Sequence, residues 1–171
     1  MPPQDAPIER RTLAVMVDNE PGVLARVVGM FSGRGYNIES LTVAETDHAA
    51  RTSRITIVTS GAPPVIDQIK AQLERIVSVH KVIDVTRDPA GVERELALIK
   101  VRGKGGDRIE ALRVSEIFRA KVIDTTLESL IFELTGSSDK IDGFLELMRP
   151  LGLVEVSRTG VLSIRRGPDK T

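Results

Sequence analysis

Residues 18–26 read DNEPGVLAR and decide the fold, because they join a strand pattern to a helix pattern. Residues 11–18 alternate apolar and polar side chains, which predicts a strand that ends at this stretch. Pro21 suits the first position of a helix, where its missing N–H costs no hydrogen bond. A helix is predicted to continue until the glycines at positions 33 and 35, with an apolar face made of Val23, Leu24, Val27, Val28 and Phe31.

The same periodicities continue through the first half of the chain. Two further strands are predicted at residues 36–45 and 53–59, an amphipathic helix at 66–76 and a last strand at 79–86. The order strand, helix, strand, strand, helix, strand is that of the ferredoxin-like split βαβ unit. We therefore predict an antiparallel sheet that carries both helices on one face.

The second half of the chain repeats this order. Helices are predicted at residues 109–118 and 141–148, and strands at 95–101, 122–126, 130–135 and 153–157, with a small edge strand at 161–164. The fold class is thus α+β, with two tandem ferredoxin-like βαββαβ domains. The expected boundaries are a disordered N-terminal segment at 1–10, a first domain at 11–87, a linker at 88–94, a second domain at 95–164 and a tail at 165–171.

The second strand of the first domain, at residues 37–45, is expected at a sheet edge in this topology. An unprotected edge of this length exposes backbone N–H and C=O groups that can pair with a second copy of the chain. A domain of this size also buries only about 60% of its extended-chain surface, so each domain is marginal alone. We therefore expect self-association.

Composition excludes several classes of function. The chain has 171 residues, 24 basic and 24 acidic side chains and no cysteine, so disulfides, thiolate chemistry and cysteine zinc sites are ruled out. Zero net charge is not the electrostatic signature of a protein that binds nucleic acid. The apolar runs are too short to cross a membrane, and the first ten residues lack the apolar core of a secretory signal. We expect a cytoplasmic protein without nucleic-acid or membrane partners.

Other candidate sites are weak. His48 and His80 are the only histidines, and neither has a partner at metal-ligand spacing, so we interpret them as surface residues of a loop and a strand. Residues 103–108, GKGGDR, resemble a dinucleotide fingerprint, but Arg108 occupies the third glycine position. A strand-to-helix turn that needs glycine explains this run better. A small nucleotide-binding enzyme stays as an alternative.

The turn at residues 19–22 is more informative. A helix start leaves amide N–H groups without intrahelical partners, and Gly22 has no side chain to block an anion. The carboxylate of a free α-amino acid suits those groups, and the Asn19 carboxamide can accept from its ammonium group, beside a small apolar pocket lined by Val23, Leu24 or Ile38. The alternative is that Asn19 is a helix cap and Gly22 a tight-packing residue, and spacing alone favours this alternative.

A family resemblance changes that balance. Residues 18–26 together with residues 31–41, FSGRGYNIESL, resemble the ACT-domain regulatory small subunit of acetolactate synthase, also called acetohydroxyacid synthase. The resemblance covers nearly the whole chain after the first ten residues, and residues 35–41 are its most specific part. It is also carried by RELALIKV at 94–101, IFRA at 117–120, RTGV at 158–161 and RRG at 165–167.

The resemblance implies a regulatory subunit with no catalytic site, metal or cofactor of its own. Its implied partner is the large catalytic subunit, which carries thiamine diphosphate, magnesium and FAD and condenses pyruvate with pyruvate or 2-ketobutyrate. The small subunit is expected to activate that partner. It is also expected to confer feedback inhibition by valine or another branched-chain amino acid in valine, leucine and isoleucine biosynthesis.

The resemblance also implies an effector site between the ACT domains of a homodimer. The matching positions are Asn19, Glu20, Pro21, Gly22, Val23 and Leu24 of one chain, with Asn37 and Ile38 of the other. The second-domain turn at 103–108 lacks the Asn-x-Pro-Gly pattern, so no effector site is expected there, and that ACT-like half is assigned mainly to assembly. The alternative is a stand-alone amino-acid-binding ACT module that regulates another enzyme or a transcription factor.

Overall fold

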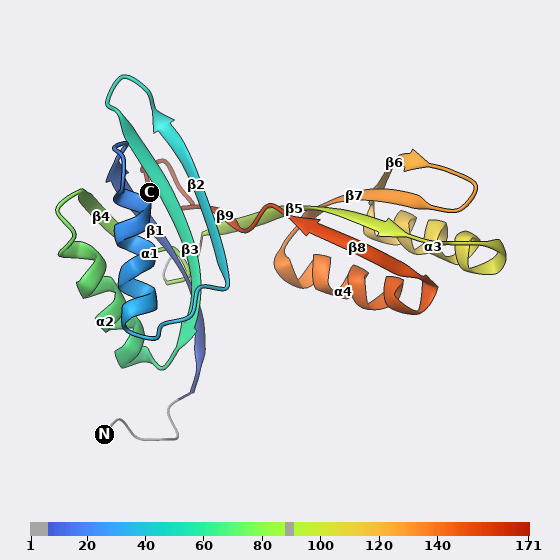
Figure 1. The fold of residues 1–171 in the computed structure, drawn as a ribbon, viewed down its shortest axis with the longest axis horizontal. Coiled ribbons are helices and arrows are strands. Elements are labelled where there is room, and N and C mark those ends of the chain that lie inside the picture. Colours follow the sequence, from blue (N-terminus) through green and yellow to red (C-terminus); the bar gives the residue numbers. More distant parts are fainter. Residues whose placement is uncertain (1–6, 88–90) are drawn as a thin grey trace. The chain divides into compact units, whose positions relative to one another are not determined.

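The computed structural model describes residues 7–87 and 91–171. Its contacts divide the chain into two compact units, residues 1–92 with 161–171 and residues 93–160. The predicted N-terminal segment at 1–10 and linker at 88–94 fall partly outside the described residues, at 1–6 and 88–90, and their described parts correct the prediction, because residues 9–10 and 92–94 belong to strands. Figure 1 shows that each unit is a sheet carrying two helices on one face.

The N-terminal unit has the predicted split βαβ topology. Its strand order is β2-β3-β1-β4, and all neighbouring strands are antiparallel, so β2 lies at the edge as expected. Its elements are β1 (Glu9–Asp18), α1 (Val23–Gly33), β2 (Ser40–Asp47), β3 (Thr52–Gly61), α2 (Pro63–Glu74) and β4 (Val79–Asp84).

Alternating side chains of this sheet form the core against the two helices. Leu13 and Val15 of β1 and Ile55 of β3 are at most 1% exposed, and these alternate residues pack on the helix side of the sheet. The helices contribute the side chains that repeat at three- and four-residue spacing, and Phe31 meets Tyr36 edge to face with ring centroids 6.2 Å apart. The helical members of the core are Val23, Val27, Phe31, Ile66, Ile69 and Leu73.

The C-terminal unit repeats the topology, with strand order β6-β7-β5-β8. Three phenylalanines join its helices to its sheet, since Phe144 lies 5.4 Å from Phe118 and 5.7 Å from Phe132 between ring centroids. Two tandem ferredoxin-like units are thus confirmed. The elements are β5 (Val92–Val101), α3 (Gly105–Phe118), β6 (Lys121–Thr125), β7 (Leu130–Gly136), α4 (Ser138–Met148), the 3-10 helix η1 (Arg149–Leu151) and β8 (Leu153–Arg158).

The second face of the N-terminal sheet is also covered. Residues 161–164, which include the short strand β9 (Leu162–Ile164), lie on this face. The Val161 N–H donates to Ser40 Oγ at 2.8 Å, and Thr42 Oγ1 donates to the Val161 carbonyl at 3.3 Å. The Arg54 guanidinium donates to the Ser163 carbonyl, and partial burial lowers the pKa of this arginine.

This cover changes one predicted boundary. The sequence pattern placed residues 161–164 in the C-terminal domain, but they belong to the N-terminal unit, and the second unit ends at residue 160. The reason is tertiary, because this segment covers small and apolar side chains of the sheet face that would otherwise be open to water, and it also accepts from Arg54. The buried members of this face are Thr12, Ala14, Thr56 and Val58.

Two element boundaries near the candidate site also differ from prediction. Helix α1 begins at Val23 rather than at Pro21, because Gly22 has a φ of 87°, which no right-handed helix contains. Strand β2 begins at Ser40 rather than at residue 36, because the chain first closes α1 through a bond from the Tyr36 N–H to the Phe31 carbonyl at 3.0 Å. Asn37 and Ile38 therefore precede the edge strand.

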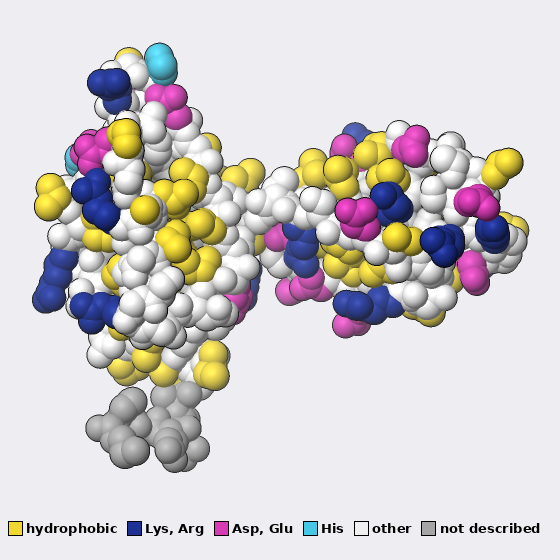
Figure 2. Space-filling model, in the orientation of Figure 1, with side chains coloured by type: hydrophobic (Ala, Val, Ile, Leu, Met, Phe, Trp, Pro, Cys, Tyr) yellow, Lys and Arg dark blue, Asp and Glu magenta, His cyan; other side chains and the backbone are white. Residues whose placement is uncertain are grey.

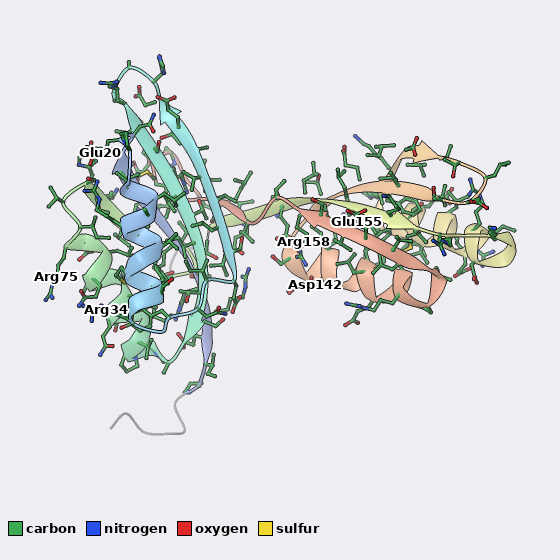
Figure 3. The ribbon with its side chains drawn as sticks, in the orientation of Figure 1. Glu20, Arg34, Arg75, Asp142, Glu155 and Arg158 are labelled. Carbon is green, nitrogen blue, oxygen red and sulfur yellow. The ribbon has the colours of Figure 1, made fainter. Side chains whose placement is uncertain are left out.

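A buried carboxylate joins a strand to a helix and to a second strand in the C-terminal unit. The Glu95 side chain is 3% exposed and accepts from Arg158, which also donates to Asp142 at 2.6 Å (Figure 3). Burial alone would lower the pKa of the Arg158 guanidinium, but the bonds and charges of Asp142 and Glu95 raise it overall. Ser138, the first residue of α4, donates to the other Glu95 oxygen at 3.3 Å.

We expect Arg158→Met to destabilise the C-terminal unit by about 2–3 kcal/mol, because it leaves the Glu95 charge buried without its cation. Urea denaturation of the full chain measures this loss. The matched control is Glu155→Gln, which breaks the exposed ion pair with Lys100 and should change stability by no more than about 0.5 kcal/mol. Equal effects of the two variants would contradict the role of the buried pair.

Candidate effector site

The turn between β1 and α1 is fixed by its neighbours. The Asn19 N–H donates to the Arg51 carbonyl at 2.7 Å, which ties the turn to the loop between β2 and β3. The Asp18 N–H donates to the Ser78 carbonyl at 2.9 Å, which ties it to the residue before β4. Three segments that are distant in sequence thus set the position of the helix start.

The helix start itself is uncapped by side chains. Gly22 is the N-cap residue of α1 and makes no side-chain cap, and the first turn of the helix holds no acidic residue. The first amide N–H groups of α1 have no intrahelical partners, no side chain among residues 7–87 and 91–171 accepts from them, and the positive end of the helix dipole lies there. This arrangement suits a carboxylate.

The structure bears on the alternative interpretation of this turn. Asn19 lies three residues before the N-cap and is not the cap. A Cβ added at Gly22 would meet no atom within 4 Å, so close packing does not require this glycine. Its positive φ does require it, because L side chains rarely adopt that conformation.

A hollow of about 390 Å³ lies beside the turn. The turn forms one wall, and the loop between β2 and β3 forms another wall that sequence patterns did not reveal. In the sequence, the one feature that could have pointed to this loop as part of the hollow was its position directly after the predicted edge strand. The residues around the hollow are Asp18, Asn19, Glu20, Pro21, Ala50 and Arg51.

The apolar candidates divide into core and surface. Val23 is 3% exposed and belongs to the core, so its side chain does not face the turn surface. Leu24 is 41% exposed and leaves an apolar surface at the helix start. Asn37 is exposed, and Ile38 packs partly against the core.

One chain does not bring the two predicted parts of the site together. Helix α1 has 11 residues and therefore separates its ends by about 16 Å. The turn precedes this helix and Asn37 follows it, and Figure 3 shows Glu20 and Arg34 at its opposite ends. A ligand the size of an amino acid cannot span that distance, so the two parts can only meet through a second copy.

Both acidic side chains of the turn are bonded to neighbours. Glu20 Oε1 accepts from Arg26 at 2.8 Å and also from the Ser78 hydroxyl. Asp18 Oδ1 lies 2.6 Å from His80 Nε2 on β4. The turn thus presents two carboxylates that are engaged by other side chains of the same unit.

Other chemistry receives no support from the described residues. Within residues 7–87 and 91–171, no group of three histidine, aspartate or glutamate side chains is arranged to hold a metal ion. His48 is 96% exposed beside Glu45, as predicted for a loop residue. Over that same part of the chain, no helix has the length and apolar character needed to cross a membrane.

Comparison with known proteins agrees with the fold. Residues 13–81 match the family described as the small subunit-like ACT domain of acetohydroxyacid synthase, and residues 94–167 match the family described as the small subunit of acetolactate synthase. The tandem split βαβ units are therefore an ACT-type regulatory architecture.

Individual relatives cover nearly the whole chain. The chain is 44% identical over 161 residues to a probable acetolactate synthase small subunit of Archaeoglobus fulgidus, covering 94% of this chain and 99% of that one. It is 47% identical over 159 residues to the isozyme 3 small subunit of Salmonella typhimurium, covering 92% and 96%. The crystal structure of the Thermotoga maritima small subunit matches with a TM-score of 0.83 at 37% identity, covering 94% and 99%. The chain belongs to the acetolactate synthase small-subunit family, which confirms the predicted resemblance.

We expect Gly22→Ala to destabilise the N-terminal unit by about 1–2 kcal/mol, because a side chain there is strained at positive φ. Gly29→Ala is the matched control inside α1, where an added Cβ meets nothing within 4 Å. The control should stabilise the unit by about 0.5–1 kcal/mol through helix propensity. Thermal denaturation of both variants checks the signs, and stabilisation by both would rule out the strained turn.

Proposed function

We propose that this chain is the regulatory subunit of an acetolactate synthase. It activates a thiamine-diphosphate-dependent catalytic subunit and confers feedback inhibition by valine or another branched-chain amino acid. The single observation that carries the effector part of this proposal is the uncapped start of α1, whose amide groups face outward from a turn of fixed position. Family membership supports the pairing with a catalytic subunit.

The effector site in this proposal lies between two copies of the N-terminal unit. In the proposed dimer, the β2 strands of the two copies pair antiparallel across a twofold axis. This pairing brings the start of α1 in one chain near the end of α1 in the other. Hydrophobic side chains gather on the face that carries α1 and β2 (Figure 2). Leu24 of α1 and Val43 of β2 are large apolar side chains that one chain leaves exposed. Pairing of the edges would bury both.

Each part of the effector has a complementary group. Its carboxylate accepts from the first amide N–H groups of α1, and its ammonium group donates to the Asn19 carboxamide. Leu24 of the same chain and Ile38 of the other contact its branched side chain, and Asn37 of the other chain holds a second polar group. A site made from two chains binds only in the dimer arrangement that joins them.

Regulation then follows from preferential binding. The effector stabilises the dimer arrangement that forms the site, and that arrangement couples less productively to the catalytic subunit. A coupling free energy of about 1–3 kcal/mol changes activity several-fold to a hundredfold. Thiamine diphosphate, magnesium and FAD belong to the catalytic subunit, and this chain contributes no group to the reaction.

Reconstitution with the catalytic subunit tests the function. The wild-type chain should raise the activity of that subunit, and valine should reverse the increase. Asn19→Ala should raise the valine concentration for half inhibition about tenfold and leave activation intact, because one hydrogen bond to a charged group is lost. Arg75→Ala, exposed just after α2, is the control and should behave as wild type. If the wild-type chain does not raise the activity of the catalytic subunit, the proposal is disproved.

Mixing subunits tests whether the site is shared. Asn19→Ala and Asn37→Ala chains should each bind valine weakly as homodimers, because both of their sites lack one group. A mixed dimer contains one site with both changes and one unaltered site. Calorimetric titration of an equimolar mixture should therefore recover wild-type affinity with at most half of the sites per mixed dimer. No recovery would show that the two asparagines do not serve one intersubunit site.

A further inference from the structure

The Glu20 carboxylate poses a problem for an anion site. Glu20 lies two residues before the N-cap of α1, and a carboxylate is favoured near the first amide groups of a helix. A carboxylate attached to the same chain is present at high effective concentration, so it competes with any free carboxylate for those amides. The site can accept an effector only if Glu20 is held elsewhere.

The structure shows what holds it. Arg26, one turn into α1, donates to Glu20 Oε1 at 2.8 Å and to Ser78 Oγ at 3.2 Å. The Ser78 hydroxyl donates to the same Glu20 oxygen, which closes a triangle of three side chains. Ser78 is 2% exposed, and its carbonyl accepts from the Asp18 N–H, so the triangle is anchored to a buried residue.

We propose that Arg26 and Ser78 are positioning residues of the effector site. They hold the Glu20 carboxylate away from the first turn of α1, so the amide groups stay open to the carboxylate of the effector. Arg26 also neutralises a negative charge that would repel that carboxylate. This inference rests on the proposed function. The claim that Glu20 is held away from the amide groups can be tested without an effector.

Effector binding gives the first test. In the isolated full chain, Arg26→Gln should weaken valine binding about tenfold, because Glu20 loses its cation, keeps only the Ser78 bond and competes for the amides. Ser78→Ala should weaken it less, about threefold, because Arg26 still holds Glu20. The decisive variant is Arg26→Gln/Glu20→Gln, which removes the competing charge and should restore the affinity to within about twofold of Glu20→Gln alone.

Two comparisons separate positioning from a general structural role. Arg113→Gln breaks a comparable exposed pair with Glu110 on α3 and should leave valine affinity unchanged. If Arg26 only supports the fold, the double variant should bind no better than Arg26→Gln. An affinity in Arg26→Gln equal to that of the wild-type chain would also overturn the inference.

Amide hydrogen exchange tests the same idea without an effector. The N–H groups of Val23, Leu24 and Ala25 should exchange about fivefold more slowly in Arg26→Gln, because Glu20 then caps them, and at the wild-type rate in the double variant. Unchanged exchange in Arg26→Gln would overturn the inference. If the exchange pattern holds but the wild-type chain binds no branched-chain amino acid, the positioning stands and the proposed function fails.

Discussion

The positive φ of Gly22 is the constraint on which the candidate site depends. It ends the turn abruptly and starts α1 with no side chain over its amide groups. A residue with a side chain there would either strain the backbone or shift the helix start. One backbone angle thus determines both where the helix begins and that its positive end faces outward from the turn.

Tertiary hydrogen bonds set the position of this helix start. The turn is bonded to the carbonyls of Arg51, in the loop between β2 and β3, and of Ser78, the residue before β4. The edge strand β2 is bonded on its other face to residues 161–164, through Ser40 and Thr42. The turn and the edge strand, which the proposed dimer would bring together, are therefore both set by the packing of one unit. A site formed between two such units needs little rearrangement within either of them.

Local periodicity predicted the order of elements because each half has a single helix-bearing sheet face, whose alternating side chains are easy to recognise. It misplaced the start of α1, since Pro21 suits a helix and only the backbone angle of Gly22 excludes it. It also assigned residues 161–164 to the wrong unit, because their partners on β2 and β3 are more than a hundred residues away in sequence. The wall of the hollow at Arg51 was missed because its contact with Asn19 is tertiary and no local pattern marks it, and the effector residues stay a prediction.

The two units show that topology alone does not make an effector site. Helix α3 starts from the equivalent turn, but its first turn contains Asp107, which already places a carboxylate at the positive end of the helix. A Cβ at Gly103, before the helix, would lie 3.0 Å from the Arg108 backbone, but Gly105 and Gly106 at the start of α3 are as open as Gly22. Arg108 also donates to Thr125 of β6 at 2.7 Å, which draws the helix start toward the sheet. The two units thus share a fold but differ at the helix start, since the first turn of α3 contains an acidic side chain and that of α1 contains none.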